Sequence, residues 1–310
     1  MTKIIRGLQN LPDDWSDCAI TIGKFDGLHL GHQYVLEWLH KLAAGLPTVM
    51  LSFYPNPLKF FQSDTEFQAI LNLRDQLFWL NEYQIDVLLL LPFNRSIQTL
   101  SATNFLILLQ QQIKAKKIVV GDDFRFGYQR AGDVDLLKHF AKAHDIDVLA
   151  SLDQYVLENA SEAVSSTEVR QLLQDGQLHA VHRLLSRPYA ITGKVIQGDQ
   201  IGRQLGFPTA NIHLKNMRPA LRGVFAVKVF QGKHFVADGV ANLGQRPTVS
   251  GLKLVLEVHL FVSDIDCYGV FLTVEFIEKI RDEQKFDSLD ALKQQIAKDV
   301  IEAKRIFRSH

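Results

Sequence analysis

From residue 23 to residue 32 the chain reads Gly23-Lys24-Phe25-Asp26-Gly27-Leu28-His29-Leu30-Gly31-His32. A short apolar run of β type, 19–22, comes directly before this stretch. Apolar residues at helical spacing come after it, at Tyr34, Val35, Trp38, Leu39 and Leu42. Gly23 and Gly27 permit tight turns in between. The sequence therefore predicts a strand, a glycine-containing loop and the start of a helix.

His29 and His32 stand where this helix is expected to begin. Residues three apart lie on one face of a helical turn, so both rings can reach the same ligand. The backbone N–H groups at a helix N-terminus also attract anions. No Gly-x-x-x-x-Gly-Lys-Ser/Thr occurs, so the predicted phosphate site is not a Walker A loop. A transition-metal site is the weaker alternative, because no third ligand stands near the two histidines.

The composition favours a small local anion over a large charged partner. Lys plus Arg equal Asp plus Glu at 34 each in 310 residues, which speaks against nucleic acid or an acidic membrane as partner. The longest apolar runs, such as 87–91, fall well short of the ~18 residues of a membrane span, and no signal peptide is evident. The two cysteines carry no metal spacing and suit a reducing compartment. We expect a cytoplasmic protein of about two domains; nothing in the sequence indicates its oligomeric state.

The rhythm of the chain changes near residue 186. Before that point apolar runs alternate with amphipathic segments such as 102–113, which predicts an α/β domain with a mainly parallel sheet. The expected strands there are 19–22, 49–53, 87–91, 118–120 and 148–149. After Arg187-Pro188, closely spaced strands are expected at 191–196, 224–230, 235–241, 253–262 and 270–277. They predict a small antiparallel barrel closed by a C-terminal helix, with Leu289, Leu292, Ile296, Val300 and Phe307 on its apolar stripe. We place the domains at 1–185 and 186–310.

A second candidate phosphate site opens a short helix at the end of the first domain. The hydroxyls of Ser166 and Thr167 can cap the helix or donate to phosphate, and Arg170 can fork onto phosphate oxygens. An ordinary capped helix, ended by Gly176, is the alternative interpretation. The presence of the His-x-Gly-His loop in the same domain favours the phosphate site.

A third candidate site lies in the second domain, where residues 198–211 read Gly198-Asp199-Gln200-Ile201-Gly202-Arg203-Gln204-Leu205-Gly206-Phe207-Pro208-Thr209-Ala210-Asn211. Its glycines let backbone approach a phosphate, and Thr209 and Asn211 offer oxygen ligands that suit Mg²⁺. A barrel loop with a proline turn is the alternative. Further along, period-two alternation puts Glu257 and His259 on the face opposite the apolar residues of 253–260. A solvated strand carboxylate is the plainer interpretation of Glu257.

Together these motifs resemble known families. The His-x-Gly-His loop and Ser-Ser-Thr-x-x-Arg resemble the nucleotidylyltransferase superfamily. The full string 23–32, Phe53-Tyr54-Pro55-Asn56-Pro57 and Gly121-Asp122-Asp123-Phe124-Arg125-Phe126-Gly127 are similar to the first half of the bacterial bifunctional riboflavin kinases/FMN adenylyltransferases. Gly206 to Asn211 resembles the Mg-ATP motif of their kinase half. The segments 238–248, 268–269 and 280–286 resemble the same half in order and spacing.

The resemblance implies a Rossmann-like adenylyltransferase domain and a riboflavin kinase barrel, with ATP, Mg²⁺, riboflavin, FMN and FAD as cofactor, substrates or products. It implies that Glu257 is the catalytic base of the kinase and that Thr209 and Asn211 hold the metal. His29, His32 and Arg170 would stabilise phosphate charge during adenylylation. The remaining binding residues implied are Gly23, Phe25, Asp26, Gly31, Asp123, Ser166, Thr167, Gly202, Arg203, Gly206, Pro208, Asn242 and Arg281.

Four positions depart from the pattern common in that family. Lys24 stands in place of Asn, Asn56 in place of His, Asn94 in place of an acid and Asp123 in place of Asn. Two alternative functions stay open from the sequence. One is a transferase of the same superfamily with another phosphorylated acceptor, which would have no need of a kinase half. The other is a flavin- or nucleotide-binding regulator without chemistry, against which the intact His29, His32, Arg170 and Glu257 weigh.

Overall fold

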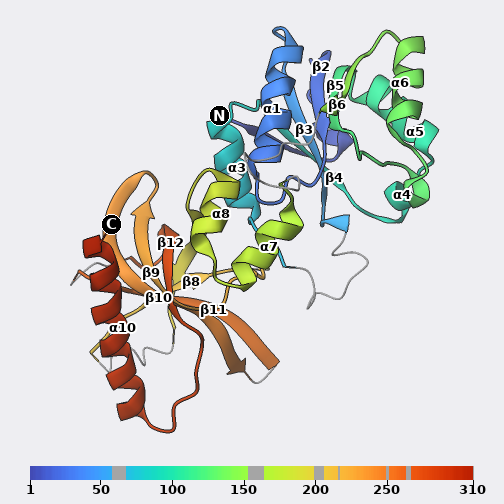
Figure 1. Cartoon of the computed structure of the whole chain (residues 1–310). Helices are drawn as coiled ribbons and strands as arrows, with labels where there is room; N and C mark the ends of the chain where they lie inside the picture. The colour runs from blue at the N-terminus through green and yellow to red at the C-terminus, as the bar shows by residue number, and fades with distance from the viewer. Residues whose placement is uncertain are drawn as a thin grey trace. The chain divides into compact units, whose positions relative to one another are not determined.

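The computed structural model describes residues 1–57, 68–152, 164–198, 206–215, 217–248, 251–262 and 267–309 (Figure 1). The chain divides into two compact units, which are described separately. The first contains residues 1–67 and 76–165, and the second contains residues 68–75 and 166–310. Within the described residues, no helix has the length and apolar character needed to cross a membrane.

The first unit is built on a six-stranded sheet in the order β1-β4-β3-β2-β5-β6, in which all neighbours are parallel. The strands are β1 (Lys3–Arg6), β2 (Cys18–Ile22), β3 (Thr48–Tyr54), β4 (Val87–Pro92), β5 (Ala115–Gly121) and β6 (Asp147–Leu152). The helices are η1 (Leu8–Asn10), α1 (Leu30–Ala43), α3 (Leu73–Glu82), α4 (Arg95–Gln98), α5 (Ala102–Ile107), η2 (Leu108–Gln112), η3 (Tyr128–Arg130) and α6 (Val134–Ala143). Of α3, residues 76–82 belong to this unit.

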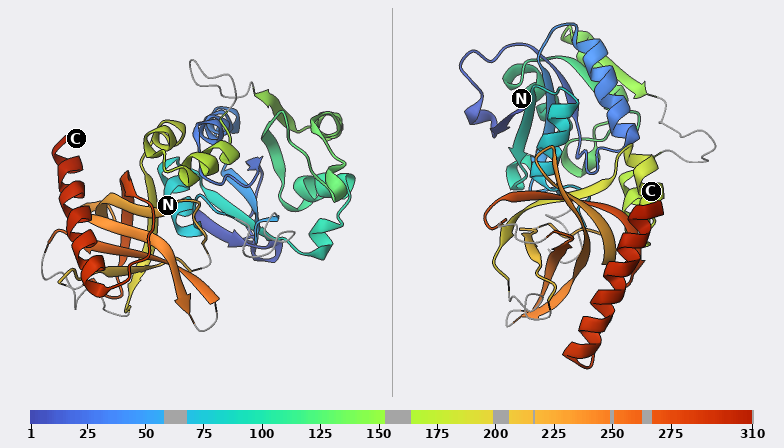
Figure 2. Two further views of the ribbon diagram at one scale, coloured as in Figure 1. Left: turned by 60° about the horizontal axis from the view of Figure 1, so that its bottom comes forward. Right: turned by 90° about the vertical axis from the view of Figure 1, so that its left-hand side faces the viewer.

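Helices cover the sheet (Figure 2), which explains why its central strands are apolar along their whole length. Every residue of β2 is buried. Ile20 and Ile22 of β2 lie on one face of the sheet. They share a core with Phe105, Leu109 and Leu137, which belong to helices that follow β4 in the chain. The predicted α/β architecture is thus confirmed. Two details differ: β1 was not expected, and the expected helix 102–113 is α5 followed by the π-helical turn η2.

The order of the strands reverses beside β2. From β2 the chain passes through α1 to β3 on one side, whereas β5 pairs with β2 on the other side. Ligands of open α/β sheets bind outside the carboxyl ends of the strands at such a switch point. The carboxyl ends here are Ile22 and Gly121, which precede the two loops singled out in the sequence.

The second unit is a closed barrel in the order β10-β11-β8-β7-β12-β9, with antiparallel neighbours throughout. The strands are β7 (Tyr189–Ile196), β8 (Ala210–His213), β9 (Gly223–Gln231), β10 (His234–Thr248), β11 (Gly251–Leu260) and β12 (Phe271–Arg281). Rings of Tyr189, Phe225 and Phe276 fill the interior, with centroids 5.3–5.7 Å apart. The predicted antiparallel barrel is confirmed. Strand β8 was not expected, since its four residues are too few to show a period-two pattern.

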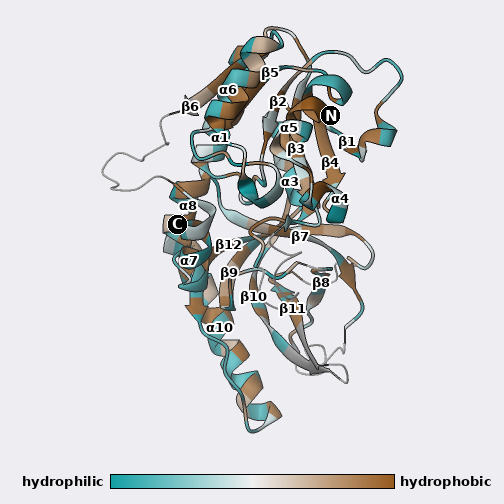
Figure 3. Cartoon of the chain, turned by 90° about the vertical axis from the view of Figure 1, so that its right-hand side faces the viewer, coloured by the Kyte–Doolittle hydropathy of each residue, from teal (hydrophilic) through white to brown (hydrophobic). Residues whose placement is uncertain are grey.

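The helices that accompany the barrel within the described residues are α7 (Ser166–Gln174), α8 (Leu178–Leu185) and α10 (Leu289–Ser309). The predicted C-terminal helix, α10, shows apolar and polar residues in alternation (Figure 3). Ala303 and Ile306 pack on Val224 and Ala226 of β9. Of the expected apolar stripe, Leu289 is 61% exposed, whereas Leu292, Ile296, Val300 and Phe307 are half-buried.

The segment 68–75 is the part of the second unit that comes from within the N-terminal half of the sequence. Asp75 accepts hydrogen bonds from the Thr192 backbone N–H at 3.1 Å and from the Asn72 side chain at 2.7 Å. Burial raises the pKa of Asp75 to about 6. On α7, Gln174 donates to the Gln68 side chain at 2.6 Å. By their contacts, helices α7 and α8 belong to the same compact unit as the barrel. The border between the two activities stays a prediction, at residues 185/186.

Candidate functional site

The two histidines of the first unit lie together as the sequence predicts. His29 is the N-cap residue of α1, and its ring stacks on that of His32 with a centroid distance of 3.7 Å and an angle of 25°. His29 is buried, at 5% exposure, and Phe25 packs on the other ring with centroids 4.8 Å apart. The stacked pair thus sits at a helix N-terminus, where the backbone also favours an anion.

The loop before α1 is buried and tightly folded. Phe25, Gly27 and Leu28 have φ values of +48°, +95° and +45°, so the predicted turn at Gly27 is confirmed. Left-handed conformations are costly for residues other than glycine and cluster where surrounding packing fixes a functional loop. Gly23 has no positive φ, and its requirement is space: a Cβ there would come within 2.9 Å of the Phe25 ring.

Gly31 packs closely next to the histidines. A Cβ at Gly31 would lie 3.3 Å from two ring atoms of His29 and 3.4 Å from the carbonyl oxygen of Val164. Val164 belongs to the same unit and stands two residues before Ser166 in the chain. The Ser-Ser-Thr motif therefore begins directly after a residue that lies against the His-x-Gly-His turn.

Asp123 and Asp26 occupy the loops at the switch point of the sheet. Asp123 is exposed and follows β5, and its Oδ1 lies close enough to Gly121 to meet a Cβ there at 3.1 Å. Asp26 follows β2 and is 8% exposed. Both carboxylates thus come from the loops after the two strands that flank the switch point.

Ser166, Thr167 and Arg170 belong to the second unit, on α7. The Arg170 Nε donates to the carbonyl oxygen of Gln68 at 2.8 Å, which fixes the stem of this side chain. The structure thus assigns the histidines and this group to different units. Their assembly into one phosphate site stays a prediction.

In the barrel, three predicted residues form a row across neighbouring strands. Glu257 of β11 lies directly opposite Asn211 of β8 and directly opposite Asn242 of β10. Residues in register on adjacent strands point to the same face of a sheet. Leu256 and Val258 are buried in the interior, so the row of Asn211, Glu257 and Asn242 is on the outer face. Glu257 is half-buried there.

The segment leading into β8 lies along the same face. Gly206 has a φ of +88°, which requires glycine, and Pro208 and Thr209 follow it. A Cβ at Gly198 would collide with the carboxamide of Asn211, so the backbone passes closely over this side chain. His259 holds the segment, because its Nδ1 lies 3.0 Å from the Pro208 carbonyl oxygen. Gly202 and Arg203 lie outside the described residues.

Arg281, at the end of β12, is fixed by a residue that the sequence analysis missed. Its guanidinium forms two hydrogen bonds with the carboxylate of Asp299 on α10, at 2.9 and 2.8 Å, and Asp299 is 3% exposed. Such a forked pair is rigid and strongly directional. The sequence offers one indication of this pair: Asp299 is a carboxylate on the apolar stripe of the C-terminal helix, between Ile296 and Ala303.

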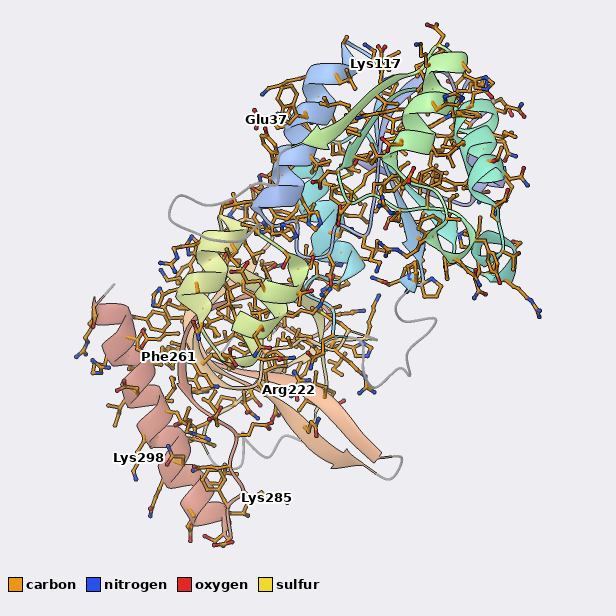
Figure 4. The ribbon with its side chains drawn as sticks, turned by 45° about the vertical axis from the view of Figure 1, so that its right-hand side comes forward. Glu37, Lys117, Arg222, Phe261, Lys285 and Lys298 are labelled. Carbon is orange, nitrogen blue, oxygen red and sulfur yellow. The ribbon has the colours of Figure 1, made fainter. Side chains whose placement is uncertain are left out.

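The guanidinium of Arg222 lies near this end of the barrel, and Figure 4 labels the residue. Burial lowers the pKa of Arg222, and the nearby Glu283 carboxylate opposes this shift. Glu283 also accepts a hydrogen bond from the Gln245 backbone N–H at 3.2 Å. The segment after β12 is thereby fastened to β10, next to Gly244, where a Cβ would collide with the Glu283 carboxylate.

Two of the positions that depart from the family pattern have structural partners. Asn94 caps α4, accepting from the Ile97 backbone N–H at 3.1 Å, a role that an acid would also fill. The Lys24 carbonyl oxygen accepts from the Gln76 side chain at 3.3 Å. Among the described residues, no group of three or more His, Cys, Asp or Glu side chains is placed to hold a metal ion.

Comparisons with known proteins match both halves of the chain. A family model described as FAD synthetase matches residues 11–168, and one described as riboflavin kinase matches residues 185–307. The chain is 41% identical to a bifunctional riboflavin kinase/FMN adenylyltransferase of Escherichia coli (strain K12), over 98% of each chain. It is 39% identical to a protein of that name from Haemophilus influenzae, over 99% of this chain and 100% of the relative.

One solved structure resembles the chain over nearly its whole length. It is described as a macrolide-efflux protein from Streptococcus pneumoniae, and the similarity has a TM-score of 0.79 at 29% identity. It covers 96% of this chain and 97% of the other. This likeness supports the two-part fold described above.

Proposed function

The chain belongs to the family of bifunctional riboflavin kinases/FMN adenylyltransferases, and from this premise we propose which of its residues carry out each step. It phosphorylates riboflavin with ATP to give FMN, and it adenylylates FMN with ATP to give FAD and pyrophosphate. We assign the second reaction to residues 1–185 and the first to residues 186–310. Its partners would then be small molecules, with no nucleic acid or membrane required, and its location the cytoplasm.

The row of Asn211, Glu257 and Asn242 carries the proposal for the kinase step. Glu257 accepts the proton of the terminal ribityl hydroxyl of riboflavin while the hydroxyl oxygen attacks the γ-phosphorus of ATP. The bond from that phosphorus to the bridging oxygen breaks, and ADP leaves. A carboxylate flanked by two carboxamides can hold the hydroxyl in position, and general-base catalysis of this kind supplies ~10²–10⁴-fold.

Asn211 of this row and the segment before β8 suit a magnesium ion with ATP. Thr209 and Asn211 offer oxygen atoms, and the backbone at Gly198 lies close to the Asn211 carboxamide. A bound Mg²⁺ would offset the negative charge of the ATP phosphates. Gly206 and Pro208 would shape the loop, and Gly202 and Arg203 are proposed to complete it. Arg281, held by Asp299, is proposed to lie near the flavin.

For the adenylyl transfer, His29 and His32 are proposed to stabilise the phosphates of ATP. The stacked rings, the helix N-terminus and the buried loop provide a fixed polar surface that suits developing charge. Gly23, Phe25, Asp26, Gly31 and Asp123 would form the rest of the nucleotide site at the switch point. Ser166, Thr167 and Arg170 are proposed to add donors, as the resemblance of the Ser-Ser-Thr-x-x-Arg motif implies.

This second reaction needs little proton transfer from the protein. The FMN phosphate oxygen is already a nucleophile, and it forms a bond to the α-phosphorus of ATP while pyrophosphate leaves. No covalent enzyme intermediate is required. Positioning and electrostatic stabilisation are sufficient.

The substitution Glu257→Gln tests the kinase assignment. It keeps the size and hydrogen-bonding capacity of the side chain and removes its basicity. We expect kcat for riboflavin phosphorylation to fall ~10²–10⁴-fold, with little change in riboflavin affinity. FMN supplied directly should still become FAD at the parental rate, which controls for folding. Phosphorylation at the parental rate would show that Glu257 is only a strand carboxylate.

A further inference from the structure

His259 stands on the same face of β11 as Glu257, two residues further along, or roughly 6–7 Å. From the sequence it is the first alternative to Glu257 as catalytic base. In the structure this ring makes a hydrogen bond with the backbone, because its Nδ1 lies 3.0 Å from the carbonyl oxygen of Pro208. A carbonyl oxygen can only accept, so Nδ1 carries the proton and donates.

The ring of His259 is held on two sides by aromatic residues. Phe207 meets it edge to face at a centroid distance of 5.4 Å, and Phe261 does so at 6.0 Å. Phe261 in turn lies against Phe307 of α10, at 6.4 Å. These contacts lock the orientation of the imidazole, so that the direction of its N–H bond is fixed relative to β11.

The bonded carbonyl belongs to the peptide group that joins Pro208 to Thr209. A fixed peptide group here also fixes the backbone of Thr209, which stands one residue before β8, and so the position of its side chain. Proline at 208 has no N–H and cannot donate to a neighbouring strand, and Gly206 before it has a φ of +88°. The His259 hydrogen bond is thus an anchor for this short segment from outside β8.

We infer that His259 is a positioning residue for the nucleotide in the kinase step: it holds the Pro208–Thr209 peptide so that Thr209 and Asn211 meet Mg-ATP in the correct geometry. It takes no proton from riboflavin. The inference rests on the proposed role of Thr209 and Asn211. It adds a residue to that site, and it couples the site through Phe261 to the C-terminal helix.

Two substitutions of His259 separate the hydrogen bond from the packing. His259→Phe keeps a ring between Phe207 and Phe261 and removes the donor. His259→Asn loses the ring, but its side-chain N–H₂ can donate from nearly the position of Nδ1. Riboflavin phosphorylation is measured for both at varied MgATP and at varied riboflavin, and the Kd for MgATP is measured by titration calorimetry in the absence of riboflavin.

The inference predicts that His259→Phe raises KM for MgATP about 3- to 10-fold, the size of one hydrogen bond, with kcat within about twofold of the parent. His259→Asn should restore KM to within about twofold of the parental value. KM for riboflavin and the conversion of FMN to FAD should not change in either variant. A parental KM for MgATP in the Phe variant would overturn the inference. So would a loss confined to kcat, since that result would mark His259 as the base.

Thr209→Ala distinguishes failure of this inference from failure of the proposed function. If Thr209→Ala impairs the use of MgATP while His259→Phe does not, only the positioning role of His259 is wrong. If Thr209→Ala also leaves KM for MgATP and kcat unchanged, the proposed metal-nucleotide segment is wrong, and the inference about His259 falls with it.

Discussion

At the residue scale, the two proposed reactions depend on the stacked pair of His29 and His32 and on the outward row around Glu257. The spacing of His29 and His32 predicts that the rings share one face, and they stack at 3.7 Å. The alternation around Glu257 predicts an outward carboxylate, and the register confirms its neighbours Asn211 and Asn242 on that face. Asp299 and the partner of His259 could not be predicted in this way. Arg281 and Asp299 are 18 positions apart in the sequence, and His259 and Pro208 are 51 positions apart.

The residue-scale prediction for the first unit concerns His32. His32→Ala should lower kcat/KM for FAD formation by about 10²-fold, the usual effect of removing one donor that stabilises transition-state charge. FMN formation from riboflavin should stay nearly parental. Both rates are measured on the same preparation, with the melting temperature as control. An equal loss of both activities at an unchanged melting temperature would indicate a single shared site.

At the scale of elements, strands and helices follow from periodicity only where they are long enough to show it. The long apolar strands of the sheet and the hairpins of the barrel were predicted. Strands β1 and β8, of four residues each, were missed. The amphipathic segment 102–113 is helical as expected, but it is divided into α5 and the π-helical turn η2.

The segment 68–75 gives a prediction about pH. The pKa of Asp75 is raised to about 6 from 3.8, so the folded unit binds this proton more tightly than the unfolded chain does. Its contribution to stability is present below about pH 4 and is lost as pH rises to about 6, with a total on the order of 1–3 kcal/mol. Asp75→Asn removes the charge and keeps an oxygen that can accept from Thr192 and Asn72. Its melting temperature, relative to the parent, should rise between pH 4 and pH 7. A difference that does not vary with pH would contradict this account.

At the scale of the whole molecule, the change from α/β rhythm to closely spaced strands predicts two domains. Which segments make up the second unit could not be predicted, because residues 68–75 belong to it although they come from the first half of the sequence. Nothing in a linear pattern marks such a segment. The hydrogen bonds of Asp75 with Thr192, 117 positions away, place it there.

A prediction at this scale compares two fragments, residues 166–310 and residues 186–310. Both contain every proposed kinase residue and should convert riboflavin to FMN without making FAD. The longer fragment should melt at a higher temperature, because α8 packs on β7 and β12 and buries Leu178, Val181, Leu184 and Leu185. Each such side chain contributes roughly 1.5–3 kcal/mol when fully buried. FAD production by either fragment would contradict the assignment of adenylyl transfer to residues 1–185.

We propose that each reaction depends on its own residues in the full chain, Glu257 for phosphorylation and the histidine pair for adenylyl transfer. The most direct test mixes the Glu257→Gln and His32→Ala proteins with riboflavin, ATP and Mg²⁺ and identifies the flavins by chromatography. Alone, the first should leave riboflavin largely unconverted and the second should accumulate FMN. The mixture should form FAD, because FMN released by one protein is a substrate of the other. A mixture that forms no more FAD than the sum of the two separate reactions would contradict the claim.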